Sequence, residues 1–230
     1  MQLMLFRRCG KSLSSDIMTR LTDSHRLFIA KAGKSTSVMR AVGQEHIVRD
    51  ISLHLLDILT NSVSAGASHM MIRIRTDQHK DLLTIRIEDD GKGMHPDFLK
   101  RVTDPFSTTR TTRKVGLGLS LFKEACEITG GNLAIESILG IGTTVTATMG
   151  ISSIDRIPLG NTGETLSGLI SSFPDRDFAI VFLNDQGEEE GLDTMNLRER
   201  LGDVPLSQPD VYVFVRDYIQ EQQQNILGGI

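Results

Sequence analysis

Tryptophan is absent from this 230-residue chain, and aromatic residues make up only 5 % of it. The hydrophobic share is nevertheless 39 %, so the core must be built mainly from aliphatic side chains and methionine. Cysteine is also rare: Cys9 and Cys126 lack metal-ligand spacing and are too few for a disulfide framework. We therefore expect a reducing, cytoplasmic location. No apolar run approaches the roughly 20 residues of a membrane span, and none is expected.

Acidic residues are scarce only at the start of the chain. Residues 1–42 hold eight basic side chains against Asp16 and Asp23, whereas the remainder carries 17 basic and 27 acidic residues. Three interpretations of this basic segment stay open: an extension without a specific role, a helix that packs or dimerises, and a targeting or polyanion-binding arm. Its "AKAGKST" stretch does not predict a phosphate loop, because Phe28 stands where that motif needs its first glycine.

Hydrophobic periodicity divides the middle of the chain into helices and hairpin strands. Helices are expected over 45–64, 97–102 and 119–131, strands over 69–77, 81–90, 132–138 and 143–150, and an aperiodic loop over 103–118. Consecutive hairpins favour a mainly antiparallel sheet. The predicted fold class is α/β (α+β): a two-layer α/β sandwich whose mixed, mainly antiparallel sheet is covered by helices on one face.

The chain changes character after residue 150, where a linker-like stretch with Pro158 and Gly160 begins. We expect a small C-terminal α/β appendage there. Its predicted elements are a helix over 165–173, a strand over 177–185, a helix over 196–202, a strand over 210–218 and a polar helix over 219–226. The predicted division is a basic extension (1–42), a main domain (43–150) and this region (151–230).

Two polar patterns in the middle region suggest chemistry. Asp57 and Asn61 lie four residues apart in an otherwise apolar helix, so they share one face, one turn apart. Alone, the pair is an ordinary polar stripe. As a functional pair, the carboxylate can activate a nucleophile while the carboxamide oxygen holds Mg²⁺.

Two glycine patterns follow. Asp89, Gly91 and Gly93 form D-x-G-x-G at a strand end, where glycines let a flat group approach the backbone and the carboxylate can accept from an amine. Gly116 and Gly118 open a predicted helix, whose N–H groups suit an anion. Each pattern alone is weak, and each is most often a turn.

The order of these patterns resembles the GHKL superfamily of ATPases, which includes gyrase, the heat-shock chaperone, mismatch-repair ATPases and histidine kinases. "DILTNSVSAGA" is similar to the family's N box and "DDGKGM" to its G1 box. "DPFSTTR" resembles the segment before the lid of histidine kinases, and "GLGLSLFKEACEITGGNLAIES" resembles their G2 box and following helix. The resemblance covers about residues 45–150.

The resemblance implies an ATP site with Mg²⁺. In it, Asn61 coordinates the metal, Asp57 orients or deprotonates the nucleophile, and Asp89 accepts from the adenine amine. The remaining implied nucleotide-binding residues are Ala65, Gly91, Gly93, Met94, Arg110, Arg113, Lys114, Gly116, Leu117, Gly118 and Thr144. This sequence departs from the family pattern at two places. Asp57 stands where the family usually has Glu or a polar residue, and Lys114 and Val115 stand where many histidine kinases have a further glycine in the lid.

Within this family the residues before Glu45 are too few for a phosphorylatable helix hairpin, and the tail is too short for a transducer domain. The expected function is a stand-alone regulatory phosphotransferase, a protein Ser/His kinase-like enzyme or ATPase similar to anti-sigma-factor kinases and to small ATP-binding proteins of anaerobic bacteria. The alternative is a nucleotide-gated protein-binding module with little turnover. Expected partners are ATP, a regulatory protein and a second copy in a homodimer, but not nucleic acid.

Overall fold

The computed structural model describes residues 50–102 and 117–228, all within a compact unit that spans 48–230. Six strands form one sheet in the order β3-β4-β2-β1-β5-β6. Their bounds are His69–Asp77 (β1), Leu82–Asp89 (β2), Asn132–Ile138 (β3), Gly142–Gly150 (β4), Asp177–Leu183 (β5) and Glu189–Asp193 (β6). Only β1 and β5 pair in parallel; every other neighbouring pair is antiparallel. The predicted mixed, mainly antiparallel sheet is confirmed.

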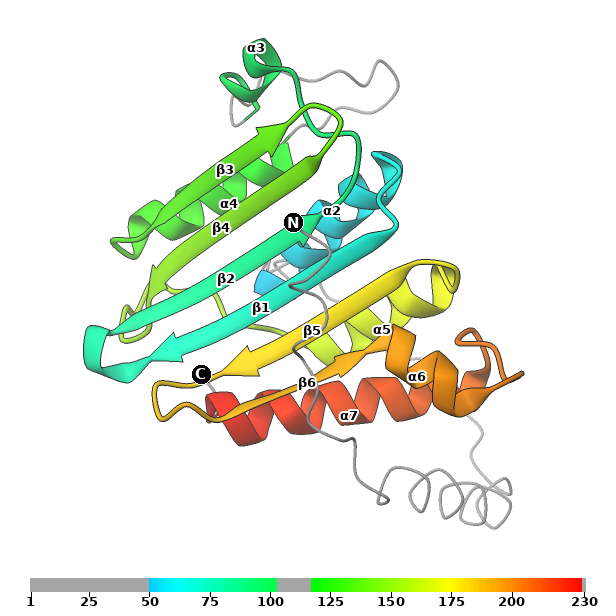
Figure 1. The fold of residues 1–230 in the computed structure, drawn as a ribbon. Helices are drawn as coiled ribbons and strands as arrows, with labels where there is room; N and C mark the ends of the chain where they lie inside the picture. Colours follow the sequence, from blue (N-terminus) through cyan, green and yellow to red (C-terminus); the bar gives the residue numbers. More distant parts are fainter. Residues whose placement is uncertain (1–49, 103–116, 229–230) are drawn as a thin grey trace, which may run out of the picture. The chain divides into compact units, whose positions relative to one another are not determined.

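Helices cover one face of this sheet (Figure 1). The helices of the described residues are α2 (Ile51–Ser64), α3 (Pro96–Leu99), α4 (Leu117–Ile128), α5 (Thr162–Ser172), α6 (Thr194–Leu201) and α7 (Pro209–Leu227), with a short 3-10 turn at Gln78–Lys80. Figure 1 places α2, α4 and α5 behind the sheet. The two-layer α/β sandwich is therefore confirmed. None of the helices in the described residues has both the length and the apolar character needed to cross a membrane.

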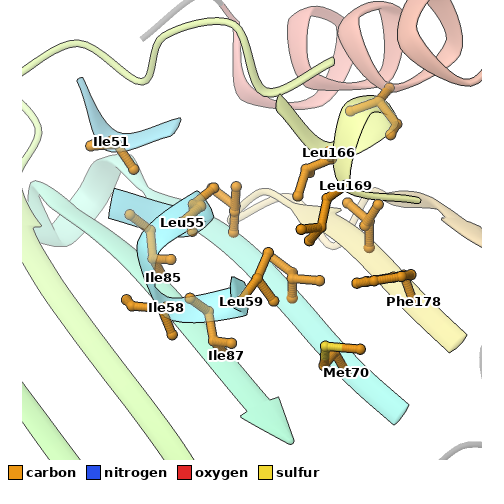
Figure 2. Packing of buried hydrophobic residues seen from close by; sticks show 14 of the residues in the cluster. Ile51, Leu55, Ile58, Leu59, Met70, Ile85, Ile87, Leu166, Leu169 and Phe178 are labelled. Carbon is orange, nitrogen blue, oxygen red and sulfur yellow. The ribbon is translucent and has the colours of Figure 1, made fainter. Parts of the chain in front are cut away.

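The core lies between the sheet and these helices. Figure 2 shows α2 contributing Ile51, Leu55, Ile58 and Leu59, which meet Ile85 and Ile87 of β2, Met70 of β1, Phe178 of β5 and Leu166 and Leu169 of α5. All of these side chains are buried. Because each contributes about 1.5–3 kcal/mol on burial, α2 is held on the sheet chiefly by its apolar stripe.

Strand alternation gives the two faces of the sheet different side chains. On the helix side, Ile72 of β1 pairs in register with Ile87 of β2 and Ile180 of β5, and all three are buried. On the other side, Arg73 pairs with Arg86, and both guanidinium groups reach Glu88, at 2.8 Å and 2.6 Å. This charged ladder suits a surface that faces water.

The C-terminal region extends the same sheet. β5 pairs with β1 along its whole length, and β6 follows at the edge, so residues 177–193 are strands of the main sheet. The expected helix near 165–173 and strand near 177–185 correspond to α5 and β5. The boundaries proposed at residues 42/43 and 150/151 remain predictions.

The strand expected over 210–218 is wrong, because those residues form the first half of α7. Val211, Val215 and Ile219 recur every four residues and are all buried, which is the helical period. Pro209 stands at the first helical position, where its missing N–H costs nothing. The apolar residues at 211, 213 and 215 also fit a strand period, and that coincidence produced the wrong prediction.

Candidate functional site

Helix α2 presents the predicted polar pair. Its N-cap Asp50 accepts from the Leu53 N–H at 3.0 Å and the Ser52 hydroxyl at 2.7 Å, which fixes the start of the helix. The apolar stripe faces the sheet, while Asp57 and Asn61 are exposed one turn apart on the other side. The Asp57 carboxylate and the Asn61 carboxamide therefore lie next to each other on the exposed side of α2.

A cavity of about 150 Å³ opens between the second half of α2, the start of α4 and the sheet. Its lining combines an apolar surface with a few polar groups. The lining residues are Ile58, Asn61, Ser62, Ala65, Asp89, Lys92, Gly93, Met94, Leu119, Ile135, Thr143 and Val145. Mostly apolar walls with a few placed polar groups are typical of small-molecule sites.

Asp89 is the carboxylate in this cavity. It ends β2, and one carboxylate oxygen accepts from the buried Ser62 hydroxyl at 2.7 Å. The other oxygen accepts from the Gly91 N–H at 2.9 Å. Each carboxylate oxygen accepts more than one hydrogen bond, so Asp89 is held in a fixed orientation and still has acceptor capacity for a ligand donor.

The loop after Asp89 is shaped by close contacts that only glycine allows. Gly93 has φ +64°, and a Cβ there would lie 2.0 Å from the Ile138 carbonyl oxygen. A Cβ at Gly91 would lie 3.0 Å from an Asp89 carboxylate oxygen. The β3–β4 hairpin also holds the loop, because Met94 N–H donates to the Ser137 hydroxyl at 2.8 Å.

Asp57 faces the start of α4. A Cβ added at Gly118 would come within 2.9 Å of an Asp57 carboxylate oxygen, so glycine lets the first turn of α4 approach that group. The two helices are also joined where His54 stacks on Phe122, with ring centroids 4.6 Å apart. The unpaired N–H groups of a helix N-terminus attract negative charge, so this corner suits anionic groups.

The structure brings many of the predicted residues together. Asn61, Ala65, Asp89, Gly93 and Met94 line the cavity. Gly91 lies in the adjoining loop, Gly118 contacts Asp57, and Leu117 is the first residue of α4. Arg110, Arg113, Lys114 and Gly116 lie outside the described residues.

Thr144, predicted as a nucleotide-binding residue, lies on the face of the sheet away from the cavity. It pairs in register with Glu88, whose side chain lies on the charged face of the sheet, while Thr143 pairs with Asp89 and lines the cavity. Successive side chains of a strand point to opposite faces, so Thr143 is the hydroxyl on the site side. To tell which threonine faces the cavity, one must know which residue of β4 pairs with Asp89 of β2. The sequence does not supply that register.

Sequence reasoning also missed Ser62 and Lys92. Ser62 follows Asn61 directly and lies one turn from Ile58, on the side of α2 that faces Asp89. A hydroxyl inside an apolar stripe was the available signal, because a buried hydroxyl needs a partner. Lys92 stands between the two glycines of the D-x-G-x-G pattern, where its N–H donates to the Ala65 carbonyl at 3.0 Å.

Comparisons with known proteins find a family match over the first half of the described residues. Residues 47–152 match the family described as "Histidine kinase-, DNA gyrase B-, and HSP90-like ATPase". The signal transduction histidine-protein kinase AtoS of Escherichia coli is 37 % identical over 108 residues, which are 46 % of this chain and 17 % of AtoS. The sensor histidine kinase WalK of Bacillus subtilis is 32 % identical over 45 % of this chain and 18 % of WalK.

The chain thus matches less than a fifth of the length of either kinase. Among solved structures, the Aquifex aeolicus MutL ATPase domain complexed with ADP aligns with a TM-score of 0.40 at 17 % identity, over 67 % of this chain and 68 % of that one. Residues 47–152 form a domain of the histidine kinase-, DNA gyrase B- and HSP90-like ATPase family.

Proposed function

We propose that this domain binds Mg-ATP, with the adenine ring in the cavity beside Asp89. The observation that carries the proposal is the Asp89 carboxylate, fixed by Ser62 and the Gly91 N–H at the wall of a largely apolar cavity. Adenine carries an exocyclic amine on a flat, weakly polar ring. The amine donates to Asp89, which can only accept when it is ionised, while the aliphatic walls cover the ring.

The shape of the site fits this ligand. Gly91 and Gly93 let the loop pack closely against Asp89 and against the β3–β4 hairpin, where a side chain at Gly93 would collide with the Ile138 backbone. Thr143 adds a hydroxyl next to Asp89, since the two residues are paired across β2 and β4. Lys92 brings a cation to the rim of the cavity. An apolar pocket with a carboxylate and a hydroxyl at one end suits a base better than a phosphate.

The triphosphate is assigned to the space between Asn61, Asp57 and the start of α4. The described residues contain no cluster of three His, Cys, Asp or Glu side chains able to bind a metal ion. Mg²⁺ commonly binds through one or two protein oxygens together with phosphate oxygens and water, so the Asn61 amide oxygen suffices as its protein ligand. The metal neutralises phosphate charge, and the α4 N-terminus adds partial positive charge.

Asp57 is assigned the role of orienting or deprotonating the attacking nucleophile. It is exposed, one turn from Asn61 and beside Gly118, so it borders the space given to the γ-phosphate. We infer that the protein is a regulatory phosphotransferase or ATPase of the anti-sigma-factor kinase type. AtoS and WalK, named as histidine kinases, support the chemistry of phosphoryl transfer but leave the acceptor open.

The second candidate is a nucleotide-gated binding module. One observation favours it: β5 pairs with β1 throughout, so the region after residue 150 is hydrogen-bonded into the ATPase sheet. A change at the cavity can therefore reach β5 through a single strand. In this version ATP alters the surface of residues 151–228, and little ATP is hydrolysed.

A labelled-phosphate assay separates the two candidates. Purified protein is incubated with Mg²⁺ and γ-labelled ATP, with and without a cell lysate, and free phosphate and protein-bound label are both counted. Label on a second protein supports the kinase, free phosphate alone supports an ATPase, and bound ATP without turnover supports the gated module. Absence of ATP binding contradicts the proposal as a whole.

Asp57→Asn tests the catalytic assignment. A positioned acid or base contributes about 10²–10⁴-fold to rate, so turnover falls by that order while ATP affinity stays within about twofold of wild type, since Asp57 lies outside the cavity lining. Glu124→Gln, at an exposed position of the neighbouring helix α4, is the control and leaves both quantities unchanged. Unchanged turnover in Asp57→Asn removes this residue from the mechanism.

A further inference from the structure

Lys92 brings a basic side chain to the cavity beside Asp89. It stands between Gly91 and Gly93, it is exposed, and it belongs to the cavity lining together with Asn61. Among the lining residues that the structure describes, Lys92 is the basic one and Asp89 the acidic one. The cavity therefore has a carboxylate in its wall and an ammonium group at its rim.

The backbone of Lys92 is held on both sides. Its N–H donates to the Ala65 carbonyl at 3.0 Å, which ties it to the end of α2. Its carbonyl accepts from the Gly140 N–H at 2.7 Å, which ties it to the turn between β3 and β4. Asn61 lies one helical turn before Ala65. The Lys92 side chain thus starts from a fixed point close to the residue assigned to Mg²⁺ and the triphosphate.

The lysines of the described residues differ in their partners. Three of the four lysines in residues 50–102 and 117–228 have a carboxylate oxygen within ion-pair distance. These pairs are Lys80 with Asp77 (3.1 Å), Lys100 with Asp97 (3.8 Å) and Lys123 with Glu127 (3.7 Å). Lys92 forms no ion pair within the same residues, although it shares the cavity lining with Asp89. Its ammonium group is therefore available to an anionic ligand.

The other charged groups around the site are acidic. Asp57 borders the start of α4, Asp89 lies in the cavity wall, and Asp90 follows it in the loop. A triphosphate brought close to these carboxylates is repelled by them. Mg²⁺ offsets part of that repulsion. An ammonium group on a flexible stem offsets more of it, because it can follow the phosphate oxygens as a point charge.

We propose that the Lys92 ammonium group binds the phosphate chain of the nucleotide and gives the site a preference for nucleotides over nucleosides. This inference rests on the proposed ATP binding. Asp89 recognises the base from the cavity wall, whereas Lys92 acts on the phosphates from the rim. The two contributions can therefore be separated by changing the ligand as well as the protein.

The test is a calorimetric titration of Mg-ATP and of adenosine into wild type, Lys92→Met, Lys92→Arg and Lys100→Met. Methionine keeps an unbranched apolar stem and removes the charge, and the backbone hydrogen bonds of residue 92 do not depend on the side chain. Lys100 is the matched control, since it is an exposed lysine directly after α3 and outside the cavity lining.

Mg-ATP affinity falls about three- to tenfold in Lys92→Met, as for a charge-assisted contact that water partly screens. Adenosine affinity stays within about twofold of wild type, because the nucleoside has no phosphate. Lys92→Arg keeps the charge and retains most of the ATP affinity, and Lys100→Met binds both ligands as wild type does. The gap in ATP affinity between wild type and Lys92→Met narrows as NaCl rises from about 0.05 M to about 0.5 M, because salt screens exposed charges.

Equal losses for ATP and adenosine in Lys92→Met would mean that residue 92 acts through the shape of the loop, and they overturn the inference. Unchanged ATP affinity in Lys92→Met, or a gap that salt leaves constant, overturns it as well. In each of these cases wild type still binds ATP and the proposed function stands. Failure of the wild-type protein to bind ATP contradicts the proposed function itself.

Discussion

The two ends of the sheet use the same architecture for different purposes. Around β5, the layer between sheet and helices is filled: Phe178, Phe182 and Ile180 are each about 1 % exposed and meet α5 and α7. Around β2 and β4, the same layer is left incomplete, and a cavity remains between α2, α4 and the strands. The difference shows how a site arises in a packed fold: one part of the layer between sheet and helices is filled, and another part leaves a cavity lined by a few polar groups.

Polar groups follow the same division. At the β5 end, the buried Thr162 hydroxyl donates to Gln223, which joins α5 to α7. At the cavity, Ser62 and the Gly91 N–H leave Asp89 with acceptor capacity for a ligand.

Phe178→Ala addresses the filled end and has the largest expected effect. Truncating a buried phenylalanine costs about 3–5 kcal/mol, from lost burial plus the cavity left behind. Phe178 lies outside the cavity lining, so ATP affinity of the folded protein stays near wild type. Urea denaturation gives the first quantity and calorimetry the second, with the 40 % exposed Val213→Ala of α7 as the near-neutral control.

If Phe178→Ala weakens ATP binding as strongly as it weakens the fold, the two ends of the sheet are not separable. The comparison then fails, because the filled end would be part of the site.

Asp89→Asn addresses the incomplete end. It replaces an ionised acceptor by a carboxamide, and a hydrogen bond to a charged group is worth about 1.5–3 kcal/mol. ATP affinity therefore falls by about ten- to 150-fold, as measured by calorimetry at constant pH. Glu136→Gln, exposed on β3, is the control and binds as wild type does. Unchanged affinity in Asp89→Asn removes this residue from the adenine site.

Asp81→Asn removes a carboxylate that connects the β1–β2 turn to the residues after β4, and it has the smallest expected effect on stability. Asp81 accepts from the Ser152 N–H at 2.8 Å and from its hydroxyl at 2.6 Å, which ties the β1–β2 turn to the residues after β4. The Ser152 hydroxyl bond is the main cause that lowers the Asp81 pKa below its ordinary 3.8, followed by the Ser152 N–H. A depressed pKa stabilises the fold above the unfolded-state value and ceases to do so as pH falls through the folded-state value.

Wild type is therefore slightly more stable than Asp81→Asn at pH 7, and the difference shrinks below about pH 3.8. Thermal unfolding at pH 7 and pH 3 measures it. A difference that is equally large at both pH values would show that charge is not the cause. Since Asn also tolerates the left-handed backbone of this turn, at φ 51°, the substitution isolates the carboxylate.

The same division explains what the sequence predicted and what it did not. In the first half, strict alternation in "HMMIRIRTD" placed β1 at residues 69–77, as observed. The D-x-x-x-N and D-x-G-x-G spacings predicted that Asn61, Asp89 and Gly93 belong to one site, and the structure places all three in the lining of one cavity. Local rules were sufficient there.

Contacts between distant segments were beyond local rules. Which of Thr143 and Thr144 faces the cavity depends on the pairing between β2 and β4. The strand β6 has the sequence "EEGLD", in which only Leu192 is buried, so no alternation marks it. The parallel pairing of β5 with β1 joins segments that are far apart in the sequence, and no short motif records it.

The most direct test of the nucleotide site compares Mg-ATP with Mg-GTP in calorimetric titrations of the wild-type protein. Adenine offers an amine where guanine offers a carbonyl oxygen, and an ionised Asp89 can accept from the first but is repelled by the second. Proposed ATP binding predicts measurable affinity for ATP and at least tenfold weaker affinity for GTP. Equal affinity for the two nucleotides, or none for ATP, would contradict the assignment of the cavity beside Asp89.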